Sequence, residues 1–350
     1  MSSKDLKDLH ELLTELFKPS EFERFLHFGP EGDTLVRALN FQQEPAHVFY
    51  EGAKLLERHG LVNRALFGRL ADERPGKRER IEAVERSILG KFAASVGTHV
   101  ITLEAPIGGN PSLISSSEFR DALGGCADLE RLRLDLNDLD VHAGPQEIWT
   151  IGQQRIQAGV RTFLRDTIAS SEERHISVFG LAPIPWLMAL GYALSETVPS
   201  RLFTRLRAPA SWSWEAERTE RDRWSWHRSG ARCAARDAVI LISASAVVRP
   251  ALVAEVLPGK VPTYALALTH PRLDAVRCEV QIEEFGQVYR EVLEAIEQEV
   301  EGVERIHVFA AAPVAVAVDC GRRILHSAAP TLVAYHLHKG AYVRALELGG

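Results

Sequence analysis

The pattern of apolar positions changes character near residue 88. Before it, apolar side chains recur every three or four positions, as Leu6, Leu9, Leu12, Leu13 and Leu16 do, which places them on one helical face. After it, short runs rich in β-branched residues alternate with helical patterns. The sequence therefore predicts a small bundle of about five helices over residues 1–87 and an α/β region over residues 88–350.

Two stretches of the α/β region share one skeleton. They are HISVFGLAPIPWLMALGYAL from His175 and IHVFAAAPVAVAVDCGRRIL from Ile306, and they align without a gap on Phe179/Phe309, Pro183/Pro313 and Gly191/Gly321. Each copy has an apolar strand, a turn of small residues and a proline at a helix start, where the missing N–H does no harm. A helical pattern precedes each copy (146–168 and 285–300) and a strand follows it (202–206 and 332–337). This is an internal duplication.

Further strand patterns extend both copies backwards. HVITLEAP from His99 and LERLRLDL from Leu129 belong to the first copy, and AVILISAS from Ala238 and PTYALALT from Pro262 to the second. The region then divides into two α/β halves, 88–236 and 237–350. Strands that alternate with helices form parallel sheets, which bind ligands beyond the carboxyl ends of their strands. The duplication predicts two such crevices, or one crevice formed by their merger.

Composition limits the classes of function. With 46% hydrophobic and 25% charged residues and no apolar run of about 18 residues, the chain is expected to be soluble, without a membrane span. Its start is amphipathic and acidic, unlike a secretion signal, which predicts a cytoplasmic protein. The net charge of −6 argues against binding long nucleic acids. A lysine-free, arginine-rich window over 201–236 still allows a local anion site.

The sequence predicts neither a metal site nor catalytic residues. Four cysteines are scattered without paired spacing or nearby histidines, so we expect buried free thiols. The motifs of nucleophile-elbow hydrolases, P-loop proteins and zinc proteases do not occur. Cys320 follows Asp319, but its place in the middle of an Ala/Val helix favours a buried thiol over a nucleophile.

The N-terminal helices carry a signature of their own: LLERHGLVNRALFGRLADERPGKRERI from Leu55, with LFKPSEFERFL upstream from Leu16. This part resembles the effector-associated domain family of bacterial, death-like helical adaptors. The resemblance implies docking onto a matching domain of a separate effector protein. The alternative is a helical cap with only a structural role.

The α/β region is similar to SAVED domains, which consist of two fused CARF-like (CRISPR-associated Rossmann-like) units and sense cyclic oligonucleotides. The similarity rests on VFGLAP, VFAAAP, the WSW strings at Trp212 and Trp224, and YHLHKGAYVRAL from Tyr335. It implies an α/β fold of two fused Rossmann-like halves behind the helical bundle. It also implies a cyclic tri- or tetranucleotide ligand, with a cyclic oligoadenylate expected, and no other cofactor.

Several residues have the chemistry to hold such a ligand. Small residues before helix starts give phosphates access to main-chain N–H groups, although tight strand–helix packing also explains them. Hydroxyls at the end of the strand from Ala238 can reach ribose or phosphate or can cap a helix. The candidates of these two kinds are Leu181, Pro183, Ala312, Pro313, Ser243 and Ser245. Pro106 is a further candidate that contributes shape alone.

Aromatic and cationic side chains complete the candidate site. Trp186 is a candidate stacking platform for a base, and Trp226 belongs to a predicted tryptophan-rich β-hairpin over 211–227. Core packing is the alternative for both rings. Arg205 and Arg207 alternate along a strand, so one of them can bind a phosphate, with solvent exposure as the alternative. His336 and Lys339 are the corresponding candidates of the second half.

Three hypotheses of different classes remain. The first is a sensor-adaptor of prokaryotic antiviral defence, in CBASS or type III CRISPR signalling. In it, ligand binding drives head-to-tail assembly with other copies of the chain, and the N-terminal domain recruits an effector. The second is a ring-opening phosphodiesterase that degrades the cyclic oligonucleotide. The third is a scaffold that binds no nucleotide.

Overall fold

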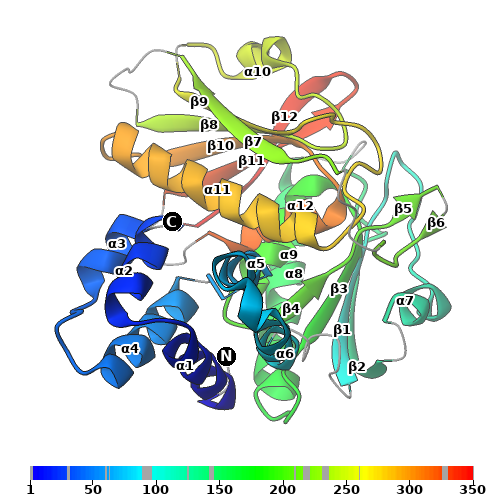
Figure 1. The fold of residues 1–350 in the computed structure, drawn as a ribbon. Helices are drawn as coiled ribbons and strands as arrows, with labels where there is room; N and C mark the ends of the chain where they lie inside the picture. Colours follow the sequence, from blue (N-terminus) through cyan, green and yellow to red (C-terminus); the bar gives the residue numbers. More distant parts are fainter. Residues whose placement is uncertain are drawn as a thin grey trace. The chain divides into compact units, whose positions relative to one another are not determined.

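The computed structural model describes residues 3–29, 32–59, 61–62, 64–88, 97–123, 126–141, 146–208, 210–215, 221–230, 236–259, 261–324 and 330–349. The chain divides into two compact units, residues 1–95 and 96–350. The first unit is helical and the second is α/β (Figure 1). The predicted fold class is confirmed.

The first unit is a bundle with its own core. Its helices are α1 Ser3–Leu16, α2 Pro19–His27, α3 Gly32–Ala38, α4 Pro45–Arg58, α5 Arg64–Glu73 and α6 Arg78–Ile88, with a short 3₁₀ helix at Pro75–Lys77. Leu9, Leu12 and Leu13 are fully buried in its core, as their spacing predicts. The structure describes six α-helices instead of about five, because Pro19 begins a separate helix under the Phe22 and Phe25 cluster. The predicted helix end at Gly60 and restart at Asn63 lie outside the described residues.

The first half of the second unit has a parallel sheet of four strands. They are β1 Gly97–Glu104, β2 Ala127–Asp135, β3 Ile176–Leu181 and β4 Ser200–Leu202, in the order β2-β1-β3-β4. The helices of this half are α7 Ser116–Leu123, α8 Glu147–Phe163, which continues as a π-helical turn over Leu164–Ile168, and α9 Ile184–Leu194.

The second half repeats this arrangement and extends it. Its strands are β8 Asp237–Ser243, β9 Thr263–Leu268, β10 Arg305–Ala311, β11 Thr331–His338 and β12 Ala341–Leu348. Its sheet also includes β7 Trp224–Ser229, which comes from the sequence before the predicted boundary at residue 237. Its helices are α10 Pro250–Val256, α11 Val280–Glu299 and α12 Val314–Arg322. The order is β12-β11-β10-β8-β9-β7, with β12 and β7 antiparallel at the edges. The parallel core β9-β8-β10-β11 therefore matches β2-β1-β3-β4, strand for strand.

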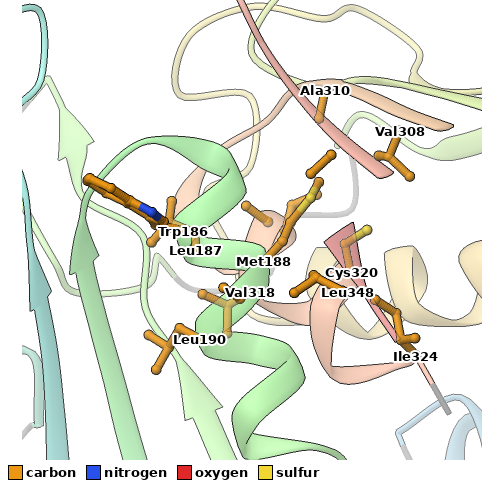
Figure 2. Packing of buried hydrophobic residues seen from close by; sticks show 14 of the residues in the cluster. Trp186, Leu187, Met188, Leu190, Val308, Ala310, Val318, Cys320, Ile324 and Leu348 are labelled. Atoms are coloured by element: carbon orange, nitrogen blue, oxygen red, sulfur yellow. The ribbon is translucent and has the colours of Figure 1, made fainter. Parts of the chain in front are cut away.

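Helices α9 and α12 pack against each other through their glycines. A Cβ added at Gly191 would lie 1.9 Å from the carbonyl oxygen of Val318, and one at Gly321 would lie 2.0 Å from that of Met188. The two contacts correspond to each other in the duplication with their roles exchanged, so the halves meet about a local pseudo-twofold axis. Figure 2 shows Met188 and Val318 within the apolar core that the halves share.

The predicted tryptophan hairpin over residues 211–227 is wrong. Trp212 follows β6 (Ala210–Ser211), which pairs with β5 (Leu206–Arg207), whereas Trp224 begins β7, which pairs with β9. Residues 216–220 of this segment lie outside the described part. Each ring packs in a different core: Trp212 against Phe179 at 5.3 Å and Trp224 against Phe285 at 5.0 Å between ring centroids. Burial against the two sheets explains why the tryptophans do not pair with each other.

The strand predicted over residues 202–206 is also shorter than expected. β4 ends at Leu202, and Leu206 already belongs to the β5–β6 hairpin. The residues between them connect the carboxyl end of β4 to the β5–β6 hairpin.

Candidate ligand-binding site

A cavity of about 590 Å³ lies between the two halves, at the carboxyl ends of β3 and β10. The turns after these two strands, which are the duplicated small-residue turns, both line it. The described residues around it are Ile107, Leu181, Ala182, Ile184, Leu187, Thr204, Arg205, Leu206, Arg207, Ala210, Ser245, Leu273, Asp274, Ala275, Val276, Ala311, Ala312, Pro313 and Val314. The structure thus brings both turns to one shared cavity.

Equivalent hydrogen bonds hold the two turns. The carbonyl oxygen of Leu181 accepts from the N–H of Ala105 (2.9 Å) and from the hydroxyl of Ser112 (2.8 Å). The carbonyl oxygen of Ala311 accepts from the N–H groups of Ala244 (2.9 Å) and Ser245 (2.8 Å). Both turns are therefore fixed to the neighbouring strand, and their small side chains leave the cavity open.

The helix starts beside these turns offer fewer main-chain donors than the sequence suggests. Pro185 removes one N–H from the first turn of α9. In α12 the N–H of Ala315 already donates to the hydroxyl of Thr204, at 3.0 Å. Fewer free N–H groups are therefore left at these helix starts than an anion site there would need. Side chains elsewhere on the wall have to supply the remaining contacts with an anion.

Arg205 and Arg207 both line the cavity but differ in their partners. Arg205 is half-buried and its Nη2 lies 2.6 Å from Oε1 of Glu118. Arg207 is exposed, and its guanidinium makes no ion pair within the described residues. Arg207 is therefore the cation of this wall that is available to an incoming anion.

Glu118 is itself held by the start of α7. The sequence Ser115 to Glu118 forms a capping box: the N–H of Glu118 donates to the Ser115 hydroxyl (3.3 Å), and the N–H of Ser115 donates to the Glu118 carboxylate (3.2 Å). One carboxylate oxygen serves the cap and the other accepts from Arg205. The cap thereby fixes the position of the Arg205 guanidinium.

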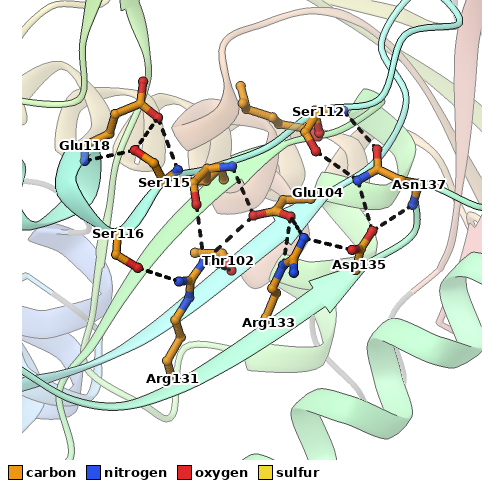
Figure 3. Close-up of polar contacts among 12 residues, drawn as sticks. Thr102, Glu104, Ser112, Ser115, Ser116, Glu118, Arg131, Arg133, Asp135 and Asn137 are labelled. Atoms are coloured by element: carbon orange, nitrogen blue, oxygen red, sulfur yellow. Dashed lines mark hydrogen bonds and ion pairs between the residues drawn. The ribbon is translucent and has the colours of Figure 1, made fainter.

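A buried carboxylate holds the chain just before the capping box of α7. Glu104, at the end of β1, is fully buried, accepts from Arg133 Nη2 at 2.7 Å and accepts from the N–H of Ile114 at 3.0 Å (Figure 3). Its hydrogen bond and charge raise the pKa of Arg133, whereas burial lowers the pKa of the nearby Arg131. This network was not predicted, although a glutamate that ends an apolar strand is a signal of it.

Trp186 does not form the predicted stacking platform. Its side chain has no exposed surface, its Nε1 donates to the carbonyl oxygen of Trp149 at 3.2 Å, and the two rings are 5.3 Å apart between centroids. A Cβ on Gly152 would lie 2.4 Å from the Trp186 ring, so α8 closes over it. The prediction is wrong because a tryptophan in the first turn of α9 faces the core and not the cavity.

The other candidates divide into two groups. Those that line the cavity are Leu181, Arg205, Arg207, Ser245, Ala312 and Pro313. Pro106, Pro183 and Ser243 are not among the lining residues, and the Ser243 hydroxyl accepts from the N–H of Val248 at 3.0 Å. The sequence missed Thr204 and Asp274, although an aspartate that follows β9 at its carboxyl end was a usable signal.

The three remaining candidates, Trp226, His336 and Lys339, do not line the cavity. Trp226 donates from Nε1 to Glu291 at 3.2 Å, on α11. His336 packs against Trp149, with ring centroids 5.2 Å apart. Lys339 and Gly340, with φ of 47° and 87°, make the tight turn between β11 and β12. Their positions are explained by packing and by the hairpin.

The described residues include no group of three side chains able to hold a metal ion. Cys278 and Cys320 are buried free thiols and Cys126 is partly buried, while Cys233 lies outside the described residues. Burial raises the pKa of Cys320 to about 12, which makes it a poor nucleophile. None of the helices that the structure describes is both long and apolar enough to cross a membrane.

Comparison with known proteins gives a family. A family model, the SMODS-associated and fused to various effectors sensor domain (SAVED), matches residues 156–348. No curated protein matches the chain. Among solved structures, the Acinetobacter baumannii Cap4 SAVED/CARF-domain containing receptor with the cyclic trinucleotide 3′3′3′-cAAA is similar at 14% identity and a TM-score of 0.48, over 94% of this chain and 76% of that one.

Two further solved structures have the same kind of similarity. The Acinetobacter baumannii Cap4 receptor described without a ligand has 13% identity and a TM-score of 0.47, over 99% of this chain and 77% of that one. The Moraxella osloensis Cap4 receptor has 14% identity and a TM-score of 0.46, over 81% of this chain and 64% of that one. Since the family model covers more than half of the sequence, the chain belongs to the SAVED sensor-domain family.

Proposed function

We propose that the cavity between the two halves binds a cyclic oligonucleotide of three or four nucleotides, of the cyclic oligoadenylate class. The observation that carries the proposal is the meeting of both duplicated turns at one cavity whose wall contains Arg205 and Arg207. Membership of a family of sensor domains supports it. The cavity volume of about 590 Å³ lies within the range of small-molecule sites.

The wall has two kinds of surface that suit such a ligand. The guanidinium of Arg207 can form paired hydrogen bonds with a phosphate. Apolar side chains on other parts of the wall, including Leu181, Leu273 and Val276, can cover the faces of bases. A ring with phosphates, ribose hydroxyls and bases needs both kinds together.

The wider role that we propose is that of a cytoplasmic sensor-adaptor in prokaryotic antiviral defence, in CBASS or type III CRISPR signalling. The helical unit of residues 1–95 has its own core, so it can act as a separate docking module for an effector. Two fused, non-identical halves allow head-to-tail contact between copies of the chain. Exposed apolar residues on loops at the carboxyl ends of the strands, Ile107, Val247 and Leu273, offer surface for such a contact.

The test of ligand binding uses the purified full chain and isothermal titration calorimetry with 3′3′3′-cAAA, 2′3′3′-cAAA and cyclic tetra-adenylate. Arg207→Ala is expected to weaken binding about tenfold or more, because it removes a charge-assisted contact with phosphate. The matched control is Arg155→Ala, which should bind as the wild type does. Arg155 is an exposed arginine on α8 that pairs with Asp138. Equal affinity of Arg207→Ala and wild type would show that the ligand does not bind at this wall.

Mixing the purified chain with a panel of cyclic di-, tri- and tetranucleotides, followed by light scattering and recovery of the nucleotide, separates the three hypotheses. Recovery of intact ligand with growth in light scattering supports a sensor that assembles. Recovery of a linear product supports the phosphodiesterase, and failure to bind any cyclic di-, tri- or tetranucleotide supports the scaffold.

The adaptor role is tested by removing residues 1–87. Tryptophan fluorescence reports the folding of the remaining unit, because all six tryptophans lie beyond residue 96. Deletion should abolish capture of the effector and leave the affinity for the nucleotide unchanged. Loss of nucleotide affinity in a folded deletion variant would contradict two independent modules.

A further inference from the structure

An aspartate occupies a pair of main-chain donors in the cavity wall. Oδ2 of Asp274 accepts from the N–H of Arg207 at 2.9 Å and from the N–H of Ala208 at 3.1 Å. Asp274 and Arg207 both line the cavity. Successive N–H groups directed at one oxygen form a concavity that binds anions, whether the anion is a carboxylate or a phosphate.

The charge of Asp274 matches the donors around it but opposes a polyanionic ligand. It is the one acidic residue among the described residues that line the cavity, and it faces a wall with Arg205 and Arg207. A fixed negative charge there opposes the entry of a polyanion.

The turn that carries the two N–H groups has supports besides Asp274. β5 and β6 pair through Leu206 with Ser211 and through Arg207 with Ala210. Arg277 Nη2 donates to the carbonyl oxygen of Ala208 at 3.2 Å and also pairs with Glu215. The two donors therefore keep their positions when the carboxylate leaves them.

We propose that the N–H groups of Arg207 and Ala208 are a phosphate subsite, which Asp274 occupies until a phosphate of the ligand replaces its carboxylate. The proposal rests on the proposed function, because the phosphate belongs to a cyclic oligonucleotide bound in this cavity. Binding is then an exchange of one anion for another at the same two donors. The guanidinium of Arg207 stands beside the subsite and meets the incoming phosphate.

The test compares Asp274→Asn and Asp274→Ala with wild type in the full chain. Two probes are titrated separately: 3′3′3′-cAAA and inorganic pyrophosphate. Both variants should bind both probes about tenfold more tightly, because a competing negative charge is gone. Asp138→Asn is the matched control, an exposed aspartate paired with Arg155 away from the cavity, and it should change neither affinity.

The outcomes separate this proposal from the function on which it rests. Unchanged or weaker binding of 3′3′3′-cAAA by both Asp274 variants leaves the function intact and overturns the subsite. Tighter binding of pyrophosphate without any binding of cyclic nucleotides supports the subsite and overturns the function. If neither variant folds, the amide resonances of Arg207 and Ala208 in the wild type decide: they should shift when pyrophosphate is added, and their failure to shift overturns the proposal.

Discussion

The two halves of the sensor unit have the same sheet core but fill it differently. In the first half, α8 carries Gly152, and the ring of Trp186 lies against it. In the second half, α11 carries Gly286, and the guanidinium of Arg323 lies against it, paired with Asp319 at 2.8 Å. Both helices use a glycine to admit a large group, but that group is apolar in one half and charged in the other. Duplication thus conserves the backbone and leaves the side chains free to diverge.

The same difference appears at the cavity. The first half supplies Arg205, Arg207 and Thr204, whereas the turn of the second half, Ala311 to Pro313, contributes no ionisable side chain. Thr204 also caps the helix of the other half. The halves are therefore equal in topology and unequal in chemistry, with the cations concentrated on the first.

The largest expected effect is that of Trp186→Ala. Removing a fully buried ring should lower the free energy of unfolding by about 3–5 kcal/mol, because it leaves a cavity between α8 and α9. The counterpart in the duplication is Val316, also fully buried, and Val316→Ala should cost only about 1–3 kcal/mol, since two methyl groups are lost. Urea denaturation followed by circular dichroism measures both. Wild-type stability of Trp186→Ala would contradict its place in the core and favour the stacking platform again.

The second effect depends on pH. Burial, aided by the charge of Arg201, lowers the pKa of His175 to about 4, whereas the unfolded value is near 6.5. As the pH falls, the unfolded chain therefore takes up the proton before the folded chain does. The contribution of neutral His175 to the free energy of unfolding is complete above pH 6.5 and is lost as the pH falls towards 4. Up to about 3 kcal/mol of stability should disappear over that window.

His307 in the second half provides the comparison for His175. Burial lowers its pKa as well, but Asp237, with Oδ2 3.6 Å from Nε2, opposes the shift. Urea midpoints by tryptophan fluorescence should lose more of their pH dependence in His175→Gln than in His307→Gln. The reverse order would show that the environments of the two histidines have been assigned wrongly.

The third effect tests the pseudo-twofold contact between α9 and α12. Gly191→Ala and Gly321→Ala should each destabilise the sensor unit by about 1–3 kcal/mol, because the added Cβ meets a carbonyl oxygen at 1.9 or 2.0 Å. Thermal unfolding followed by tryptophan fluorescence measures the loss. Gly68→Ala, in α5 with nothing within 4 Å of its added Cβ, is the control. It should be neutral or stabilising by up to about 1 kcal/mol, as seen by circular dichroism. Clearly unequal losses of stability in Gly191→Ala and Gly321→Ala would contradict the equivalence of the two contacts.

The smallest effect is that of the cap that only one half supplies. Thr204→Val removes the acceptor of the Ala315 N–H and should cost about 0.5–2 kcal/mol. Thr204→Ser keeps the hydroxyl and serves as the control. Urea denaturation of both variants gives the difference, and equal stability of the two would mean that solvent replaces the cap without cost.

The sequence by itself determined the order of the elements and the duplication. Strand and helix periodicities depend on local chemistry, so β1, β3, β8 and β10 lie where the apolar runs predict them. The gap-free alignment of Gly191 with Gly321 likewise held, because a close helix contact demands glycine at both places. Six of the candidate residues line the cavity, since residues after the carboxyl ends of parallel strands share one edge of a sheet.

Tertiary structure alone decided which side of each element faces the cavity. Trp186 and Arg205 are both plausible ligand contacts by residue type, but rotation of α9 buries the first, and the capping box of α7 holds the second at the wall. The partners of Trp212 and Trp224 were open for the same reason, because long-range packing outweighs a hairpin between neighbours in sequence. Asp274 acquired its role only when the chain placed it opposite two N–H groups that lie some 66 residues earlier. Periodicity fixes local conformation, whereas contacts between distant residues depend on how the whole core packs.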